Sequence, residues 1–68
     1  MQMIPVASSN LAAVGYDEQS ATLYIQFHSG RYMYFDVPVQ VFQGLLSAPS
    51  KGKYHHQYIK NVYRYQRY

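Results

Sequence analysis

The chain has no cysteine and few charged residues, which make up 13% of its 68 positions against the roughly 25% usual in globular domains. Without cysteine it can form neither disulfides nor thiolate metal sites, and this absence fits a reducing compartment. No run approaches the roughly 18 apolar residues of a membrane span, and the N-terminus has no basic start or apolar run typical of a targeting segment. We therefore expect one soluble, cytoplasmic domain over residues 1–68.

Residues that could carry catalysis are also scarce. The only acids are Asp17, Glu18 and Asp36, and the first two lie in a predicted turn, where carboxylates are usually solvated. Nucleophilic catalysis needs a nucleophile, a base and an orienting group in contact, and no serine is spaced from a histidine in a way that supports this. The sequence predicts no catalytic residue and no cofactor, so we expect a binding protein rather than an enzyme.

The histidines do not form a recognisable metal site. His55 and His56 are neighbours on a predicted helix, so their side chains point about 100° apart and cannot chelate one metal together. His28 is distant in the sequence, and we expect no metal. A nuclease-like role for His55 or His56 with Lys53 is the one catalytic alternative.

Aromatic residues are abundant where charges are few. The chain has nine tyrosines and three phenylalanines, and each aromatic side chain buries roughly 150–250 Å². A domain this short hides only about 60% of its unfolded surface, so tight aromatic packing or self-association must supply its stability.

Three segments alternate apolar and polar residues as β-strands do: 11–16, 22–27 and 31–36. A four-residue loop at 17–20 and a two-residue turn at Ser29-Gly30, with Gly30 free to take positive φ, would join them. Ile25 then faces Tyr34 on one neighbouring strand, and Val14 faces Leu23 on the other. The predicted core face comprises Ala12, Val14, Tyr16, Leu23, Ile25, Phe27, Tyr32 and Tyr34.

Two helices are predicted after the strands. Pro38 suits the first position of a helix that stops near residues 47–49, with Phe42, Leu45 and Leu46 as its apolar stripe. Gly44 inside this helix permits the close approach of a neighbour. Ser50 would cap a second helix to about Lys60, and the alternating tail 62–68 reads as an edge strand. The expected fold class is α+β: a small three-stranded antiparallel β-meander followed by two short helices, with the N-terminal segment and the tail as additional edge strands.

Positive charge gathers at the end of the chain. From residue 51 to residue 68 there are five basic residues and no acidic one. This asymmetry favours an anionic partner, although a solvated basic segment that keeps the domain soluble is the alternative.

Several runs together resemble the KTSC domain family, a small bacterial and phage module. The matching runs are Val6-x-Ser8-Ser9-Asn10, Val14-Gly15-Tyr16-Asp17, Tyr32-x-Tyr34, Val37-Pro38, Ser47-Ala48-Pro49-Ser50-Lys51-Gly52-Lys53-Tyr54, Ile59 and Tyr63-x-Tyr65-x-Arg67. The resemblance implies a protein that occurs alone or as the C-terminal tail of some lysyl-tRNA synthetases. It also implies RNA binding by association with the synthetase, and it supplies no catalytic residues.

Two basic segments are candidates for a phosphate or nucleic-acid site. Backbone N–H groups at the start of the second helix favour a phosphate, with two lysines nearby, unless this is only a capped helix start. The tail interleaves tyrosines and cations, which would stack bases and neutralise phosphates, or else form an ordinary charged edge strand. The predicted binding residues are Ser50, Lys51, Gly52, Lys53, Lys60, Arg64 and Arg67, with Tyr54, Tyr63 and Tyr65 for stacking.

The other sheet face is a second candidate surface. Its predicted members are Tyr24, Gln26, His28, Arg31, Met33 and Phe35. An uncovered patch with aromatic residues marks an interaction site, so a protein partner or a homo-oligomer, in a phage accessory role for example, is the alternative to RNA. On the core face, Tyr32 and Tyr34 are either packed under the helix or a stacking platform for bases. The leading hypothesis is a non-catalytic module that binds RNA or another phosphate-bearing ligand.

Overall fold

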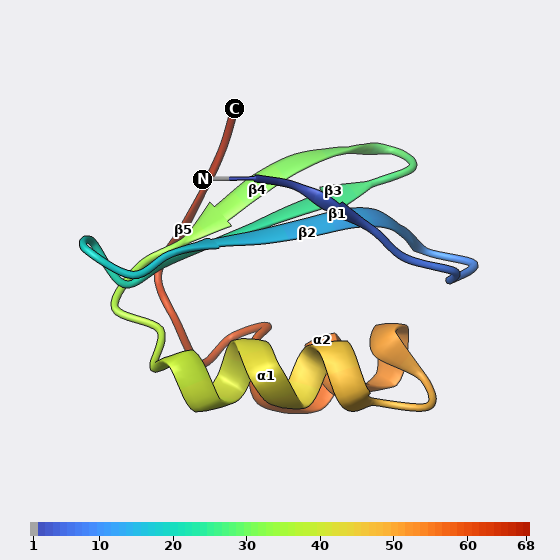
Figure 1. Cartoon of the computed structure of the whole chain (residues 1–68). Helices are drawn as coiled ribbons and strands as arrows, with labels where there is room; N and C mark the ends of the chain where they lie inside the picture. The colour runs from blue at the N-terminus through green and yellow to red at the C-terminus, as the bar shows by residue number, and fades with distance from the viewer. Residues whose placement is uncertain (1) are drawn as a thin grey trace.

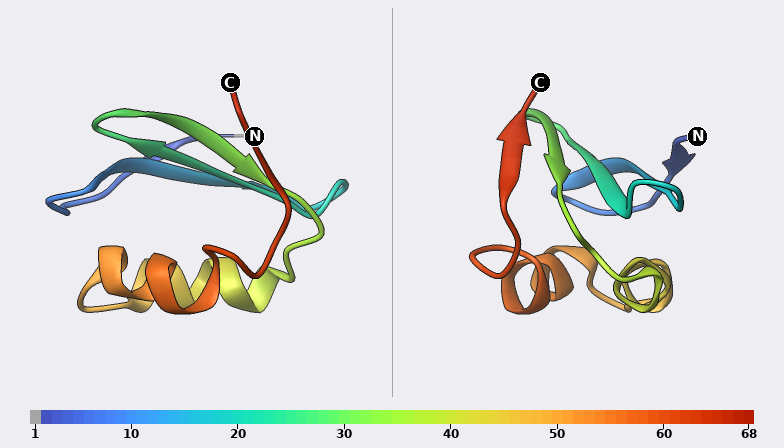
Figure 2. Two further views of the ribbon diagram at one scale, coloured as in Figure 1. Left: turned by 180° about the vertical axis from the view of Figure 1, so that it is seen from behind. Right: turned by 90° about the vertical axis from the view of Figure 1, so that its left-hand side faces the viewer.

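A computed structural model describes residues 2–68 of the chain, which form one sheet and two helices. The elements are β1 (Ile4–Pro5), β2 (Leu11–Asp17), β3 (Thr22–Phe27), β4 (Gly30–Tyr34), α1 (Val39–Ser47), α2 (Lys51–Tyr58) and β5 (Tyr65–Arg67). The sheet is antiparallel and ordered β1-β2-β3-β4-β5. Both helices lie side by side on one face of it (Figure 1 and Figure 2).

The α+β class is confirmed, and the sheet is larger than the predicted three-stranded meander. The central three strands correspond to the predicted ones, except that β2 is one residue longer and β4 spans 30–34 rather than 31–36. Strands β1 and β5 extend the sheet by one short strand at each edge. The tail therefore forms the edge strand that its alternation predicts.

The pairing of the central strands differs from the prediction by two residues. Ile25 pairs with Tyr32 rather than Tyr34, and on the other side Val14 pairs with Ile25 rather than Leu23. Because side chains alternate with a period of two, a shift of two leaves the side chains of the regularly paired residues on their predicted faces. Val14, Leu23, Ile25 and Tyr34 are accordingly all buried.

The turns explain the shift. The β3–β4 turn is His28-Ser29, so Gly30 is the first residue of β4 and pairs with Phe27. Gly30 does not take the positive φ expected of it. Among residues 2–68, positive φ occurs instead at three residues that are not glycine: Ala21, Asp36 and Asn61.

A bulge at the start of β2 corrects one predicted core residue. The register slips between Leu11 and Ala13, so that Leu11 pairs with Phe27. An extra residue in one strand re-aims the side chains beside it. Leu11 is therefore fully buried, whereas Ala12, the predicted core residue, is only half-buried.

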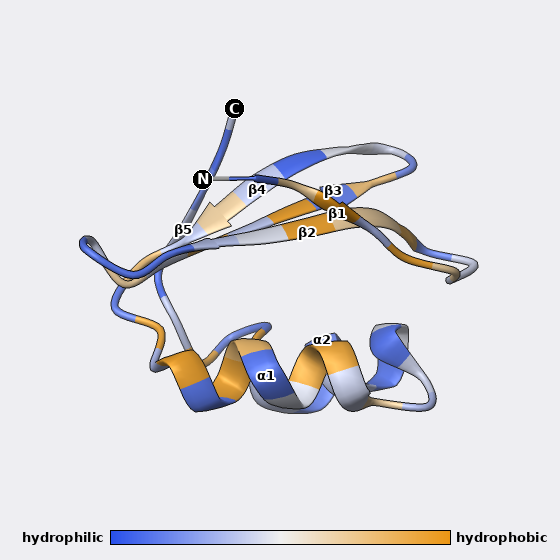
Figure 3. Ribbon diagram, in the orientation of Figure 1, coloured by the Kyte–Doolittle hydropathy of each residue, from blue (hydrophilic) through white to orange (hydrophobic). Residues whose placement is uncertain are grey.

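Helix α1 contributes an apolar stripe to the sheet, which Figure 3 shows as orange turns alternating with blue ones. Pro38 is its N-cap rather than its first helical residue. Leu45 is buried, and Phe42 and Leu46 pack against the core as predicted. The Tyr16 hydroxyl donates a hydrogen bond to the carbonyl oxygen of Val37, which fixes β2 to the start of the helix.

Helix α2 is polar, as its blue and white colouring in Figure 3 shows, and none of its residues is buried. Ser50 is the predicted N-cap, and its Oγ accepts a hydrogen bond from the Lys53 backbone N–H at 3.4 Å. The helix ends at Tyr58, two residues earlier than expected, and Ile59 immediately after it is fully buried.

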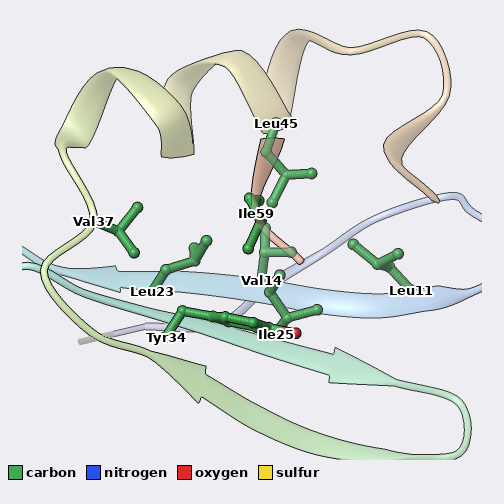
Figure 4. Close-up of a cluster of buried hydrophobic side chains, with 8 residues drawn as sticks. All are labelled: Leu11, Val14, Leu23, Ile25, Tyr34, Val37, Leu45 and Ile59. Atoms are coloured by element: carbon green, nitrogen blue, oxygen red, sulfur yellow. The ribbon is translucent and has the colours of Figure 1, made fainter. Parts of the chain in front are cut away.

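The core lies between the sheet and the helices (Figure 4). Its eight buried hydrophobic residues come from the sheet, from α1 and from the segments that flank the helices: Leu11, Val14, Leu23, Ile25, Tyr34, Val37, Leu45 and Ile59. No buried polar side-chain atom among the described residues lacks a hydrogen-bond partner. Neither helix within residues 2–68 is long and apolar enough to cross a membrane.

We predict that Gly44→Ala destabilises the domain, because Tyr54 of α2 packs directly on Gly44. A Cβ built on Gly44 would lie 2.8 Å from the Tyr54 Cζ atom, with the hydroxyl oxygen closer still. Overpacking costs about 1–3 kcal/mol, which outweighs the roughly 1 kcal/mol by which alanine favours a helix over glycine.

The matched test is a double-mutant cycle measured by urea unfolding. In a Tyr54→Ala background the overlap is gone, so the same Gly44→Ala change should raise stability by about 1 kcal/mol. An equal effect of Gly44→Ala in both backgrounds would contradict the close packing of the two helices.

Candidate nucleic-acid interface

A polar groove of about 880 Å³ lies where the loop after β1 approaches α2. We call it the α2 groove; it is lined by residues 7–10, 49–53, 55–57 and Lys60. In Figure 1 the blue loop 6–10 and the orange start of α2 lie at the same end of the molecule. Its volume falls within the roughly 300–1,000 Å³ of ligand pockets.

The loop side of the groove is held by its own hydrogen bonds. The Ser8 Oγ accepts from the backbone N–H groups of Asn10 and Leu11, at 3.2 and 3.3 Å. On the helix side, a Cβ at Gly52 would lie 2.8 Å from the side-chain amide nitrogen of Asn10, so a larger residue at position 52 would force the Asn10 side chain to move. Gly52 therefore allows the Asn10 side chain to lie directly against the start of α2.

Three lysines line the groove, and no Asp or Glu does. The Lys51 ammonium donates a hydrogen bond to the Ala48 carbonyl oxygen at 3.1 Å, next to the C-terminal end of α1. Lys53 and Lys60 are exposed and carry no salt bridge among the described residues. The groove is therefore positive and accessible.

The acidic residues lie at the other end of the molecule. Asp17 ends β2 and Glu18 follows it in the β2–β3 turn, which is the cyan turn opposite the start of α2 in Figure 1. Asp36 lies in the link between β4 and α1, where its carboxylate pairs with Arg64 at 3.5 Å. This separation leaves the potential of the groove uncompensated by nearby carboxylates.

A smaller cavity of about 280 Å³, the aromatic pocket, adjoins the groove between α2 and the β4–β5 edge of the sheet. It is lined by Phe27, Ser29, Tyr32, Tyr34, His55, Lys60, Asn61 and Tyr65. His55 and Lys60 line both cavities. A positive groove and an aromatic cavity thus share a wall.

His55 is the polar centre of this pocket. Its Nε2 atom and the Tyr34 hydroxyl are hydrogen-bonded at 2.8 Å, and its ring meets Phe27 edge-to-face at 4.9 Å. Burial, with nearby Lys60 and His56, lowers the pKa of His55 to about 4. Burial, with nearby Tyr32 and Tyr65, raises the pKa of Tyr34 to about 12. Both groups are therefore neutral at pH 7.

The structure brings together part of the predicted binding set. Ser50, Lys51, Gly52, Lys53 and Lys60 all line the α2 groove. Tyr65 lines the aromatic pocket. Arg67 lies beside this pocket, with its guanidinium 5.8 Å from the centre of the Tyr32 ring and 3.4 Å from the Ser29 carbonyl oxygen.

The prediction that all ten residues share one surface is wrong for three of them. Tyr54 packs against Gly44 and the core rather than facing the groove. Tyr63 is half-buried against the core. Arg64 lies on the other sheet face, over the Phe35 ring at 5.4 Å. Side chains alternate along an extended tail, so Arg64 and Tyr65 point to opposite faces.

The outer sheet face has no helix over it (Figure 2) and contains most of the second predicted surface. Tyr24 pairs with Met33, and Gln26 pairs with Arg31. His28 is the exception, because it lies in the β3–β4 turn, where its Nε2 is 3.3 Å from the Ser8 carbonyl oxygen.

The end of the chain partly covers this face. The Tyr68 ring meets the Tyr24 ring edge-to-face at 5.8 Å, and Arg31 lies over Tyr68 at 5.0 Å. Arg64 covers Phe35 in the same way. The apolar area left open to a partner is thus smaller than the sequence indicates.

Sequence reasoning missed the loop side of the groove and the role of His55. Ser8 and Asn10 belong to a run that matches the family pattern, but a short polar run carries no chemical signal of its own. The sequence presents His55 only as a metal ligand or a base, because its contact with Tyr34 joins residues 21 apart in the chain. Tyr34 is 4% exposed and belongs to the core, and it lines the aromatic pocket together with half-buried Tyr32.

Comparisons of the sequence and of the structure with known proteins point to the same family. The family model of the KTSC domain matches residues 7–63. A crystal structure of a KTSC domain protein from Yersinia pestis superposes with a TM-score of 0.96 at 37% identity, and covers 98% of this chain and 96% of that one.

Sequence relatives are of two kinds. A protein from Stutzerimonas stutzeri is 41% identical over 69 aligned residues, which cover 98% of this chain and 97% of its own. A lysine–tRNA ligase from Nostoc sp. is 42% identical over 59 residues, which cover 85% of this chain. The chain spans only about 10% of the length of that ligase.

We predict that the domain loses stability as the pH falls from about 6.5 to about 4, because His55 stays neutral when folded and gains a proton when unfolded. The unfolded state then binds more protons, which makes the free energy of unfolding rise with pH across this window. The pKa of His55 is about 4 in the folded protein, whereas the ordinary value for histidine is 6.5. We expect a loss of about 1–2 kcal/mol, since partial exposure of the ring screens the full effect.

Thermal unfolding between pH 4.5 and pH 7 measures this loss. His55→Gln should flatten the pH dependence, whereas His56→Gln, a change at the exposed neighbouring residue, should preserve it. If the two variants behave alike, His55 is not the source of the dependence.

Proposed function

This chain belongs to the KTSC domain family, and we propose that it is a non-catalytic module that binds RNA, holding phosphates in the α2 groove. The observation that carries the proposal is the composition of that groove, which has three lysines and no carboxylate among its lining residues. Most of the affinity of proteins for nucleic acids comes from such contacts between cations and phosphates.

The charge distribution supports a polyanionic ligand. The chain has a net charge of +3, and its acidic residues lie away from the groove. An extended positive surface also steers a polyanion toward the site over several ångströms at low salt. A small anion would need only one of the three lysines, whereas a backbone with successive phosphates can engage all of them.

The relatives favour RNA among polyanions. Lysine–tRNA ligases act on tRNA, and those from Nostoc sp. and Trichormus variabilis contain segments 42% and 44% identical to this chain. A small basic domain in such an enzyme would add affinity for its RNA substrate through phosphate contacts. We propose that this chain makes such phosphate contacts through its α2 groove.

The second candidate function is protein binding or homo-oligomerisation through the outer sheet face. Half-buried Tyr24, Met33 and Phe35 favour it, since a helix-free apolar face is a usual docking surface. Tyr68 and Arg64 cover part of this face, which makes it the weaker candidate.

We predict that charge reversal in the groove weakens RNA binding at least tenfold. The variant is Lys53→Glu with Lys60→Glu, because these two lysines are exposed and Lys51 also contacts the end of α1. Fluorescence anisotropy with a labelled single-stranded RNA measures the affinity. Each lost phosphate contact reduces the slope of log K against log salt by about 0.7, so the slope should fall by about 1.4.

The matched control is Arg31→Glu with Arg64→Glu, which makes the same change in net charge on the outer face. It should change affinity by less than about threefold, through long-range screening alone. If both pairs of substitutions have equal effects, binding is a non-specific response to net charge. A larger effect of the outer-face pair would move the site to that face, and no RNA binding by the unmodified chain would overturn the proposal.

A further inference from the structure

The aromatic pocket is built differently from the groove beside it. Phe27, Tyr32, Tyr34 and Tyr65 supply four aromatic rings from three adjacent strands, and His55 closes the pocket from α2. At about 280 Å³ it lies just below the range of roughly 300–1,000 Å³ typical of drug-sized ligands. It is therefore of a size for one small planar group rather than for a longer segment.

No two of these four rings are stacked in parallel, and Tyr65 is tilted by 37° from Tyr34 at 5.8 Å. Phe27 and Tyr32 meet edge-to-face at 5.6 Å, and Tyr65 is tilted by 54° from Tyr32 at 5.8 Å. Tyr65 is also 59% exposed. A ring held at the rim of a cavity with one face free can stack on a planar ligand at little cost in side-chain order.

Several tyrosines around a cavity can also recognise a cation, and the charges decide against this here. The Lys60 side chain forms part of the wall, and the guanidinium of Arg67 already lies 5.8 Å from the Tyr32 ring centre. Both would repel a quaternary ammonium or methylated lysine. The pocket instead fits a planar ligand that is neutral or that carries an attached anion.

The polar groups of the pocket are also neutral and suited to the edge of such a ring. His55 and Tyr34 are both uncharged at pH 7, as shown above, and they are fixed by their mutual hydrogen bond at 2.8 Å. Asn61 and Ser29, both exposed, add an amide and a hydroxyl at the rim. A nucleobase is flat, uncharged and rich in donors and acceptors at its edge, and it matches this lining.

The shared wall joins the two cavities into one site. Lys60 lines both the aromatic pocket and the α2 groove, so a ring in the pocket and a phosphate in the groove can belong to one nucleotide. From this arrangement we infer that the aromatic pocket accepts one unpaired base of the RNA whose phosphates lie in the α2 groove. The inference rests on the proposed function and adds a preference for single-stranded RNA.

Base-paired RNA cannot use the pocket without unstacking a base, which costs a few kcal/mol. The expected ligand is thus a loop, bulge or free end, where unpaired bases can turn outward onto aromatic side chains. A duplex of the same length would bind through phosphate contacts alone.

The test compares Tyr65→Leu with Tyr68→Leu, since both residues are partly exposed tyrosines near the end of the chain but lie on opposite sheet faces. Affinity is measured for a single-stranded RNA carrying 2-aminopurine and for a duplex of equal length. Tyr65→Leu should weaken single-strand binding by about 5- to 150-fold, the range that corresponds to loss of one base stack. It should leave duplex binding unchanged. The fluorescence of 2-aminopurine should be quenched by the unmodified chain and by Tyr65→Phe, and it should not be quenched by Tyr65→Leu.

Tyr65→Phe separates loss of stacking from loss of folding, because it keeps the aromatic ring. It should retain the affinity of the unmodified chain, and all variants should be checked for a cooperative thermal transition. Tyr68→Leu should bind like the unmodified chain.

The outcomes distinguish this inference from the proposed function. If Tyr65→Leu binds single-stranded RNA normally while Lys53→Glu with Lys60→Glu does not, the pocket holds no base and the groove proposal stands. Equal affinity for duplex and single strand, with no quenching, also overturns the base pocket. If neither set of substitutions matters, both proposals fail.

Discussion

Burial of a single sheet face is the constraint on which the rest of this structure depends. A chain of 68 residues without cysteine has only one layer of apolar side chains to stabilise it. Every large, fully buried side chain lies between the sheet and the helix layer, including Leu45 from α1 and Ile59 just after α2. The outer sheet face and α2 contribute no fully buried side chain to this core, and α2 provides much of the lining of the polar groove.

Helix α2 is held to the rest of the domain by few contacts. It buries none of its own residues, and it is positioned by the Ser50 cap, by Tyr54 against Gly44 and by the hydrogen bond between His55 and Tyr34. Each contact leaves the lysines outside the core. Of the side chains that position the helix, Tyr54 does not line the groove, whereas Ser50 and His55 do both.

Alternation along β3 was enough to predict the core face, because Leu23, Ile25 and Phe27 differ clearly from their neighbours. The exact pairing was not predictable, since a two-residue shift preserves every face and leaves no trace in the pattern. The bulge at Leu11 and the left-handed Ala21, Asp36 and Asn61 depend on long-range packing that one sequence does not display. For the site, the cluster of lysines in the sequence was enough to predict the position of the groove. That Arg64 and Tyr65 lie on opposite sheet faces became clear only from the structure.

The short outer strands have a consequence for how the molecule behaves in concentrated solution. The sheet ends in β1, which is two residues long and contains Pro5, and in β5, which is three residues long and contains Arg67. Proline has no N–H to donate, and a charged side chain disfavours pairing with the strand of a second molecule. Both edge strands therefore resist edge-to-edge pairing. Although 49% of its residues are hydrophobic, the chain is protected from fibril-like association by these two short edge strands.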